Sequence, residues 1–385
     1  MAASLHTKLC DVLGVRHPII QTAMGWVATP ELVAGTCNAG AFGFLAVATL
    51  RAVDAERAIV RVKELTDRPF GVNFLTEQPG APQIIESIIR HRVRAASYSR
   101  APSREFVRQL KDAGVLCVPT VGAVRHAEKA VELGADVIVA QGGEGGGHTG
   151  AVPTTLLLPQ VLDAVDVPVV AAGGFYDGRG LAAALAYGAV GIAMGTRFLL
   201  TEESPVPRET LKRYFAAQVT DIPVTTRVDG LPHRMIRNEL VRRLESSNAV
   251  TLLVRALRSA LAYRKLSGAS VGQLLSAGLA MRRGERLTRA QTLMAANAPI
   301  LIRKAMVEGH PEEGVLPSGQ VAGLIDDLPT CADLIARIVA DAEARLGELA
   351  GLARGLPAQA PADVAAEASA EAPAQPRTSA PDRVS

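Results

Sequence analysis

Short apolar runs alternate with amphipathic stretches along about the first 200 residues of the chain. Most of the runs are rich in Val, Ile, Ala or Phe and hold four to six residues. Near-continuous apolar runs of this length are typical of parallel strands that are buried on both faces. The predicted strands cover residues 18–21, 42–46, 70–75, 94–98, 116–121, 137–141, 167–172 and 190–194.

Amphipathic stretches of helical length lie between these runs. Several carry the local signals of helix ends: Thr29 and Pro30 read as an N-cap and a first helical residue, and Gly114 and Gly134 as C-terminal caps. The predicted helices cover residues 31–38, 54–66, 82–92, 103–112, 124–133, 154–165 and 178–187.

Repeated β–α units of this kind predict an α/β fold, specifically a closed (β/α)8 TIM barrel. An open doubly wound sheet is the structural alternative, but it would place its glycine fingerprint after the first strand. There the chain reads Ala23-Met24-Gly25-Trp26, which is not that fingerprint. The glycine-rich turns follow the sixth, seventh and eighth strands instead, where a barrel places a phosphate site.

The pattern changes after the last predicted strand, which divides the chain into four parts. Residues 1–215 are predicted to form the barrel. Residues 216–320 read as a basic helical segment without strand alternation, which we expect over the barrel mouth. Residues 321–355 are expected to supply a last helix that returns to the barrel wall. Residues 356–385 are rich in Ala and Pro and are predicted to be disordered.

Composition narrows the function. The chain has 385 residues, of which 48% are hydrophobic and only 4% aromatic, so it lacks the stacking platform of a nucleic-acid binder. No apolar stretch reaches about 18 residues and the first 16 residues lack a signal-peptide core, so we expect a cytoplasmic protein outside the membrane. The four cysteines are far apart, which predicts buried thiols and no metal site: Cys10, Cys37, Cys117 and Cys331.

The charge is unevenly distributed. Residues 201–310 hold 18 lysines and arginines against 9 aspartates and glutamates, a net charge of +9, whereas the rest of the chain carries −6. This asymmetry has two interpretations, an anionic ligand near the basic segment or a set of solvated helix faces.

Two consecutive glycine turns predict a phosphate pocket. Gly173-Gly174 follows the seventh strand, and Gly195-Thr196 follows the eighth. Glycine lets backbone N–H groups approach an anion closely, a following helix adds a favourable dipole, and Thr196 can add a hydroxyl. These are the strands beside which barrels bind phosphate.

The loop after the sixth strand, residues 142–148, predicts an acid/base residue. Its glycines allow the backbone to fold tightly and to present His148 at the barrel mouth. Histidine titrates near neutral pH, so it can accept or give a proton under working conditions. Glu144 is expected to orient either the loop or the imidazole ring.

Other residues at the mouth are candidates for holding a planar heterocycle. The turn after the first strand contains Met24, Gly25 and Trp26, and the third strand contains Asn73. Simple packing is the alternative role for Met24 and Trp26. The chain has no HExxH, Walker loop, GxSxG or carboxylate pair, so zinc hydrolysis, nucleotide triphosphate chemistry and triad catalysis lack their parts.

Motifs along the barrel resemble the nitronate monooxygenase (2-nitropropane dioxygenase) family. The resemblance implies an FMN-dependent TIM barrel with His148 as the catalytic histidine. It also implies that phosphate is bound by Gly173, Gly174, Gly195 and Thr196, and that Met24, Gly25, Asn73 and Gln141 lie near the flavin ring and ribityl chain. The matching segments are residues 18–21 with Met24, 38–40 with Gly43, 71–73, 142–148, 172–174 and 195–198.

The chain departs from the nitronate-oxidising pattern at Ala23, where those members have proline before the methionine. The Gly25-Trp26 sequence that follows is more similar to flavin-dependent enoyl-thioester reductases. A narrower resemblance, to the IpdC-type flavoproteins of actinobacterial steroid (cholesterol) degradation, covers residues 21–28, 141–158, 225–244, 293–299 and 314–329. It implies dehydrogenation of a hydroxy-indane-carboxyl-CoA. Oxidation of alkyl nitronates with O2 and reduction of enoyl thioesters are the alternatives.

An acyl-CoA substrate would account for the basic segment, because CoA carries several negative charges. Arg227, His233 and Arg234 are therefore predicted to contact the substrate, and Trp26 in the turn after the first strand is a further candidate. The alternative is that the basic residues close the loop over the flavin or lie in solvent. The turn at Ser318-Gly319-Gln320 could border the flavin. NAD(P)H is a candidate electron partner, and a homodimer is one candidate assembly.

Overall fold

The computed structural model describes residues 5–99, 103–247 and 297–354. Its main sheet is parallel, and its strands coincide closely with the predicted apolar runs. Along the sheet the order is β5-β4-β3-β2-β1-β10-β9-β7-β6. The strands are β1 (Ile19–Gln21), β2 (Phe42–Ala46), β3 (Gly71–Leu75), β4 (Ala95–Ser99), β5 (Leu116–Cys117), β6 (Thr120–Val121), β7 (Ile138–Gln141), β9 (Val169–Ala172) and β10 (Ile192–Met194).

The barrel closes through the fifth predicted strand, which proline divides into β5 and β6. Val118 donates its N–H to the carbonyl of Ala96 in β4, and Pro119 accepts from the N–H of Val139 in β7. Proline has no N–H and cannot continue a ladder on both sides, so the strand changes partner at this point. Two predicted strands, from residues 18 and 167, likewise begin only after Pro18 and Pro168.

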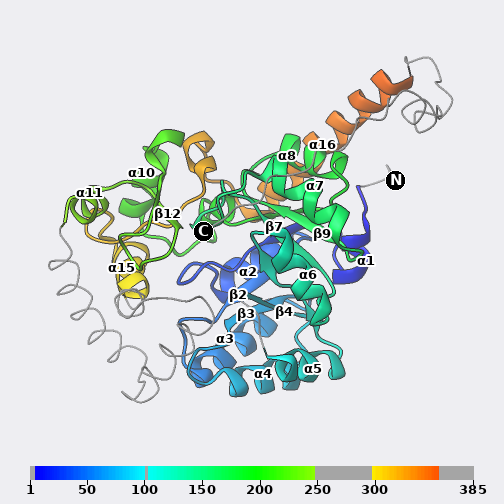
Figure 1. The fold of residues 1–385 in the computed structure, drawn as a ribbon, viewed down its shortest axis with the longest axis horizontal. Helices are drawn as coiled ribbons and strands as arrows, with labels where there is room; N and C mark the ends of the chain where they lie inside the picture. The colour runs from blue at the N-terminus through cyan, green and yellow to red at the C-terminus, as the bar shows by residue number, and fades with distance from the viewer. Residues whose placement is uncertain (1–4, 100–102, 248–296, 355–385) are drawn as a thin grey trace, which may run out of the picture. The chain divides into compact units, whose positions relative to one another are not determined.

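Helices follow the strands and lie on the outside of the barrel (Figure 1). The predicted (β/α)8 barrel is thus confirmed. The helices of this part are α1 (Lys8–Leu13), α2 (Pro30–Asn38), α3 (Ala52–Leu65), α4 (Ala81–Arg90), α5 (Arg104–Asp112), α6 (Val124–Glu132), α7 (Thr154–Ala164), α8 (Gly178–Ala186) and α9 (Thr196–Leu199).

The barrel interior is filled by alternate residues of the strands. Phe42 and Phe44 of β2 belong to one buried cluster with residues of β1, β4, β7, β9 and β10. Leu9 and Leu13 of α1 join this cluster, so the N-terminal helix contributes to the interior packing. At Gly71 of β3 a Cβ would lie 2.3 Å from Cε1 of Phe44, so glycine makes room for the aromatic ring.

The segment after the barrel strands differs from the prediction. Residues 216–320 were expected to be helical without strands, but their described parts include two strands, β11 (Val224–Thr225) and β12 (His233–Arg234). β12 pairs antiparallel with β11 and with β8 (Gly147–His148) in the glycine loop. Tertiary pairing with β8 supplies the hydrogen bonds that two-residue strands cannot provide by themselves.

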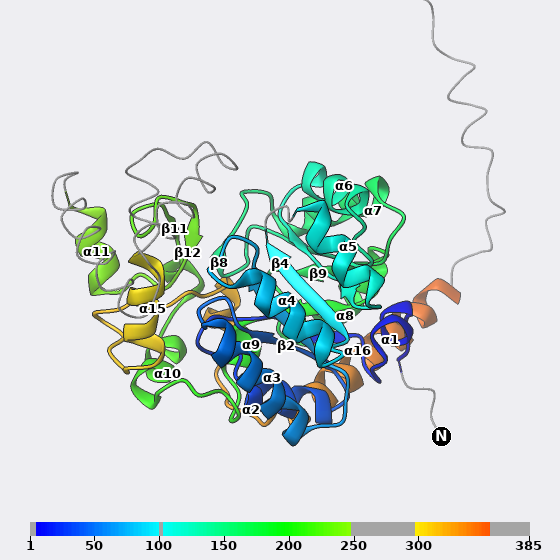
Figure 2. The same ribbon diagram turned by 90° about the horizontal axis from the view of Figure 1, so that it is seen from below.

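Helices accompany this small sheet. In both views α10, α11 and α15 group together with β12 (Figures 1 and 2). The elements outside the barrel are α10 (Arg208–Phe215), η1 (Val219–Asp221), α11 (Glu239–Glu245), α15 (Asn297–Met306), η2 (Gln320–Leu324) and α16 (Cys331–Arg354).

The last helix, α16, packs against the barrel helix α8. A Cβ at Gly178, the first residue of α8, would lie 2.5 Å from the carbonyl oxygen of Ile338. The predicted Ala/Pro-rich tail, residues 356–385, lies outside the described residues. None of the helices in the described ranges is long and apolar enough to cross a membrane.

Gly71→Ala should destabilise the barrel by about 1–3 kcal/mol, because the added methyl group overlaps Phe44 in a packed interior. Chemical denaturation followed by circular dichroism measures the effect. Gly347→Ala in α16 is the matched control, since a Cβ there meets no atom within 4 Å and alanine is the better helix former. Equal stability of the Gly71 variant and the wild type would contradict the packing described.

Candidate active site

The residues predicted to form the site gather at one end of the barrel. Met24 and Gly25 follow β1, Gln141 ends β7, and the two glycine turns follow β9 and β10. Asn73 lies in β3, where its side-chain N–H2 donates to the carbonyl of Ser97 at 3.2 Å. Because all of these strands are parallel, their carboxyl ends meet at the same mouth.

The two glycine turns form a small cradle. Gly173 and Gly174 have φ of 90° and 87°, a left-handed conformation that favours glycine. At Gly195 a Cβ would lie 2.9 Å from Oγ1 of Thr22 and 3.5 Å from Sδ of Met24, so the turn after β10 lies against the turn after β1.

Backbone donors in this cradle are available to a ligand. Within the described ranges, the N–H groups of Gly174 and Gly195 donate no hydrogen bond. Thr196 accepts the N–H of Gly319 on Oγ1 at 2.9 Å, which brings the predicted 318–320 turn to the cradle. α8 begins only at Gly178 and its first turn is capped by Asp177, so the turn itself and not the helix end supplies the donors. This arrangement fits a small dianion such as a phosphate monoester.

The glycine loop that carries His148 is held on several sides. The Glu144 carboxylate accepts from Oγ1 and N–H of Thr154, at 2.7 and 3.0 Å, so it orients the loop and not the imidazole. Nε of Arg234 donates to the carbonyl of Gly143 at 2.9 Å, and Nε2 of Gln141 donates to the carbonyl of His148 at 3.1 Å. The loop is therefore fixed by side chains from three segments.

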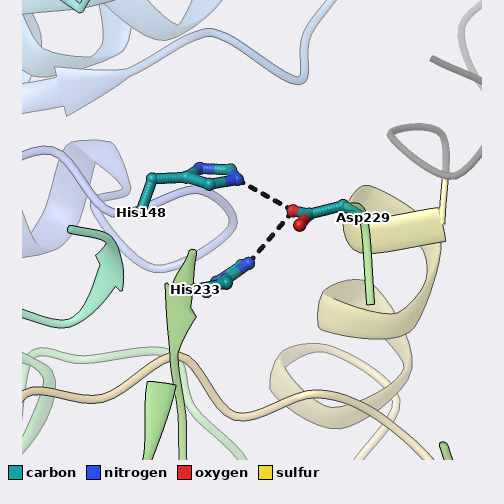
Figure 3. A group of neighbouring side chains, drawn as sticks. All are labelled: His148, Asp229 and His233. Atoms are coloured by element: carbon teal, nitrogen blue, oxygen red, sulfur yellow. Dashed lines mark hydrogen bonds and ion pairs between the residues drawn. The ribbon is translucent and has the colours of Figure 1, made fainter. Parts of the chain in front are cut away.

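His148 lies in a cluster that pairs it with a second histidine. In the β8–β12 pair His148 stands directly opposite His233. Nε2 of His148 lies 2.8 Å from Oδ2 of Asp229, and Nδ1 of His233 lies 3.1 Å from the same oxygen. Both rings point toward this carboxylate (Figure 3). The other oxygen, Oδ1, accepts the N–H of Leu231 at 3.2 Å.

Burial and hydrogen bonding set the charges in this cluster. Burial raises the pKa of Asp229, but the hydrogen bonds from His148 and His233 outweigh it, so the pKa lies well below its usual range. Burial lowers the pKa of His233, against the opposing effect of its bond to Asp229. Asp229 is therefore ionised, and the buried His233 is neutral.

An ionised carboxylate only accepts hydrogen bonds, and this fixes the proton on each ring. His148 donates through Nε2–H, so in its neutral form the lone pair resides on Nδ1. The His148 side chain is 54% exposed, whereas that of Asp229 is 2% exposed. An exposed imidazole backed by a buried carboxylate is suited to accept a proton from a bound molecule.

The same three side chains are of types that bind metals. Within the described ranges they form the one cluster whose donor atoms lie within 4.8 Å of one another. Both imidazole nitrogens approach a single carboxylate oxygen at hydrogen-bond distance. The contacts are those of donors to an acceptor, so hydrogen bonding accounts for the cluster by itself.

The residues predicted to contact substrate differ in position. Arg227 is exposed, and its side chain has no partner in the described part of the chain. His233 is 2% exposed and binds Asp229. Arg234 donates to two backbone carbonyls, those of Gly143 and Ile222. Trp26 is partly buried, has φ of 68° and carries an indole N–H without a partner among the described residues.

Asp229 is the functional residue that the sequence prediction missed. It belongs to a segment singled out for its basic residues, in which a carboxylate four residues before His233 was a usable signal. Its contact with His148 spans 81 residues, and nothing in the local pattern indicates that pairing.

Asp229→Asn should lower the free energy of unfolding at neutral pH by about 1.5–3 kcal/mol, because hydrogen bonds to a charged acceptor are weakened. The pKa of Asp229 is lowered by folding, so the ionised group stabilises the fold above pH ~4 and this contribution is lost as the pH falls further. Urea unfolding between pH 8 and pH 3 measures the gap between variant and wild type.

The exposed Asp326→Asn serves as the control and should change stability little. The gap for Asp229→Asn should narrow only below pH ~4. If it closed between pH 7 and pH 5, the carboxylate would not hold its charge as described.

Comparison with known proteins places the chain among flavin-dependent oxidoreductases of one family. The family model for nitronate monooxygenase matches residues 6–87 and 80–341. A protein of Rhodococcus jostii strain RHA1 is 54% identical over 350 residues, which cover 91% of this chain and 99% of the relative. It is named (3aS,4S,5R,7aS)-5-hydroxy-7a-methyl-1-oxo-octahydro-1H-indene-4-carboxyl-CoA dehydrogenase. A protein of Mycobacterium tuberculosis with the same name is 51% identical over 351 residues, covering 90% of this chain and 99% of the relative.

A solved structure supports the same relationship. FabK from Thermotoga maritima superposes with a TM-score of 0.76 at 30% identity, covering 91% of this chain and all of FabK. The predicted family and barrel fold are thereby confirmed, and with them the prediction of a flavin-dependent oxidoreductase. The chain belongs to the nitronate monooxygenase family.

Proposed function

We propose that this protein is an FMN-dependent dehydrogenase of a hydroxy-indane-carboxyl-CoA thioester in steroid degradation, with His148 as its base. The observation that carries the proposal is the exposed His148 imidazole, bound through Nε2 to the buried Asp229 carboxylate. The two dehydrogenases above 50% identity indicate the substrate.

The glycine cradle supports FMN as the flavin. The free N–H groups of Gly174 and Gly195 would hold its phosphate, and a single glycine-lined cradle suits one terminal phosphate group. Met24, Asn73 and Gln141 would lie along the ring and the ribityl chain. When bound, the flavin supplies the hydride acceptor for the reaction.

His148 would take the proton on the carbon next to the thioester carbonyl. The thioester acidifies that proton, and Nδ1 of His148 carries the free lone pair that accepts it. The neighbouring carbon would lose its hydrogen as a hydride, which carries two electrons with it. Loss of the proton and the hydride leaves a double bond between the two carbons. Asp229 would stabilise the imidazolium without itself being protonated, because the hydrogen bonds from the two histidines hold its pKa well below the usual range of a carboxyl group.

Arg227 is the residue best placed to bind the CoA part of the substrate. It is exposed and lies two residues before Asp229, so an anion bound there would be near the base. Arg234 and His233 are held inside the protein and would instead maintain the loop and the base. NAD(P)H is proposed as an electron partner: it would donate a hydride to the oxidised flavin, and its oxidised form NAD(P)+ would accept a hydride from the reduced flavin.

His148→Ala should leave the flavin bound and slow its reduction by the indane acyl-CoA by about 10²–10⁴-fold, because the general base is lost. Anaerobic stopped-flow absorption of the holoenzyme measures the reduction, and the chromophore released by heat is identified as FMN or another flavin. His126→Ala, an exposed histidine on α6, is the control and should reduce at the wild-type rate. Rapid reduction of the His148 variant would remove His148 from the role of base.

The same anaerobic experiment separates two alternative functions. An alkyl nitronate that bleaches the flavin while the acyl-CoA does not would favour nitronate oxidation, which the family match supports. If only NAD(P)H reduces the flavin and an enoyl thioester reoxidises it, the protein would be a reductase. The Ala23-Met24-Gly25-Trp26 sequence is similar to that of flavin-dependent enoyl-thioester reductases.

Arg227→Ala should weaken binding of the acyl-CoA roughly tenfold at low salt, because a charge-assisted contact to phosphate is lost. The loss should shrink as the salt concentration rises. Titration of the holoenzyme at two salt concentrations measures both effects. Arg104→Ala, an exposed arginine on α5, is the control. The indane N-acetylcysteamine thioester lacks the CoA phosphates, so an equal loss with it would exclude Arg227 as a phosphate contact.

A further inference from the structure

The second histidine of the cluster has no role in the proton transfer itself. His233 is 2% exposed, and its ring centroid lies 4.6 Å from that of His148 at an interplanar angle of 37°. It is buried behind the exposed imidazole, so a substrate would meet His148 first. Nε2 of His233 is buried and has no hydrogen-bond partner within the described ranges. The ring is thus bound through one nitrogen only.

The one hydrogen bond of His233 goes to the same Asp229 oxygen that binds His148. Nδ1 of His233 and Nε2 of His148 both approach Oδ2 of Asp229, at 3.1 and 2.8 Å. Oδ1 is bound separately by the N–H of Leu231. With a donor on each oxygen, the carboxylate cannot rotate about its Cβ–Cγ bond without losing a bond in a buried environment, which is costly.

We propose that His233 is a positioning residue that locks the Asp229 carboxylate and thereby fixes both the tautomer and the direction of His148. The inference rests on the proposed role of His148 as base. His148 lies in a glycine loop and has a half-exposed ring, so it needs an external restraint. The locked carboxylate holds Nε2–H, which leaves the lone pair on Nδ1.

The backbone supports this role independently. Antiparallel pairing of β8 with β12 puts His148 and His233 in directly opposite positions. Arg234, the next residue of β12, binds the carbonyl of Gly143 in the loop of His148. The strand that carries His233 is therefore fixed to the loop that carries the base.

Two substitutions distinguish positioning from simple packing. His233→Asn keeps an N–H2 group at the place of Nδ1, since both atoms are bonded to Cγ. His233→Gln is closer in volume to histidine but carries its amide one carbon farther out, near the place of Nε2. If His233 positions Asp229, its function should be retained in His233→Asn and lost in His233→Gln. If His233 only fills space, His233→Gln should retain the function better.

The tautomer of His148 is read directly in the holoenzyme. Long-range ¹H–¹⁵N correlation spectra of ¹⁵N-histidine-labelled protein, assigned with His148→Ala, should show Nε2–H in the wild type and His233→Asn. His233→Gln should show a mixture of tautomers. Retention of a single Nε2–H tautomer in His233→Gln would overturn the proposal. This measurement needs no substrate, so it stands even if no thioester reduces the flavin.

Kinetics provide the second readout. His233→Gln should slow flavin reduction by roughly 10–100-fold with KM unchanged, as when the residue that orients a functional group is lost. In the Asp229→Asn background the Gln substitution should have no further effect, because His233 acts through Asp229. Full additivity in this double-mutant cycle would overturn the proposal. Flavin content and the thermal midpoint establish that each variant is folded. A His233→Asn variant that folds but is as slow as His233→Gln would also contradict the positioning role.

Discussion

The site depends on one buried negative charge. Asp229 is 1% exposed, and an ionised carboxylate in such a place is tolerated only when donors compensate for its lost hydration. The donors come from the glycine loop, from β12 and from the turn at Leu231. Satisfying this charge therefore holds the sixth barrel loop and the β11–β12 hairpin together, and the same contacts orient the exposed imidazole.

Backbone and side chains divide the work of the barrel mouth. The turns after β9 and β10 offer main-chain N–H groups, which suit an anion whose position must be fixed but whose chemistry does not change. The loop after β7 offers an imidazole, which can exchange a proton. Residues that the charge pattern grouped together have separate roles: Arg234 fixes the loop, His233 fixes the carboxylate, and Arg227 remains exposed.

Most of the barrel could be predicted from the sequence because each strand is a local apolar run with its own turn signals. The prediction was wrong where strand formation depends on pairing with segments that are distant in the sequence. The fifth strand divides at Pro119. A strand of a closed barrel forms hydrogen bonds with a neighbouring strand on each side, and proline has no N–H to donate to either of them. The segment after the barrel was predicted to lack strands because β11 and β12 hold two residues each and form only by pairing with each other and with β8.

By itself the sequence determined the barrel, the two glycine turns, the histidine loop and the family. These features are encoded in short stretches whose spacing has a direct structural meaning. Only the tertiary structure decided which group orients His148, because Asp229 lies 81 residues away and is brought near by strand pairing. For the same reason it moved His233 from a predicted substrate contact to the buried side of the base, where Nδ1 of His233 meets the carboxylate oxygen that His148 also binds.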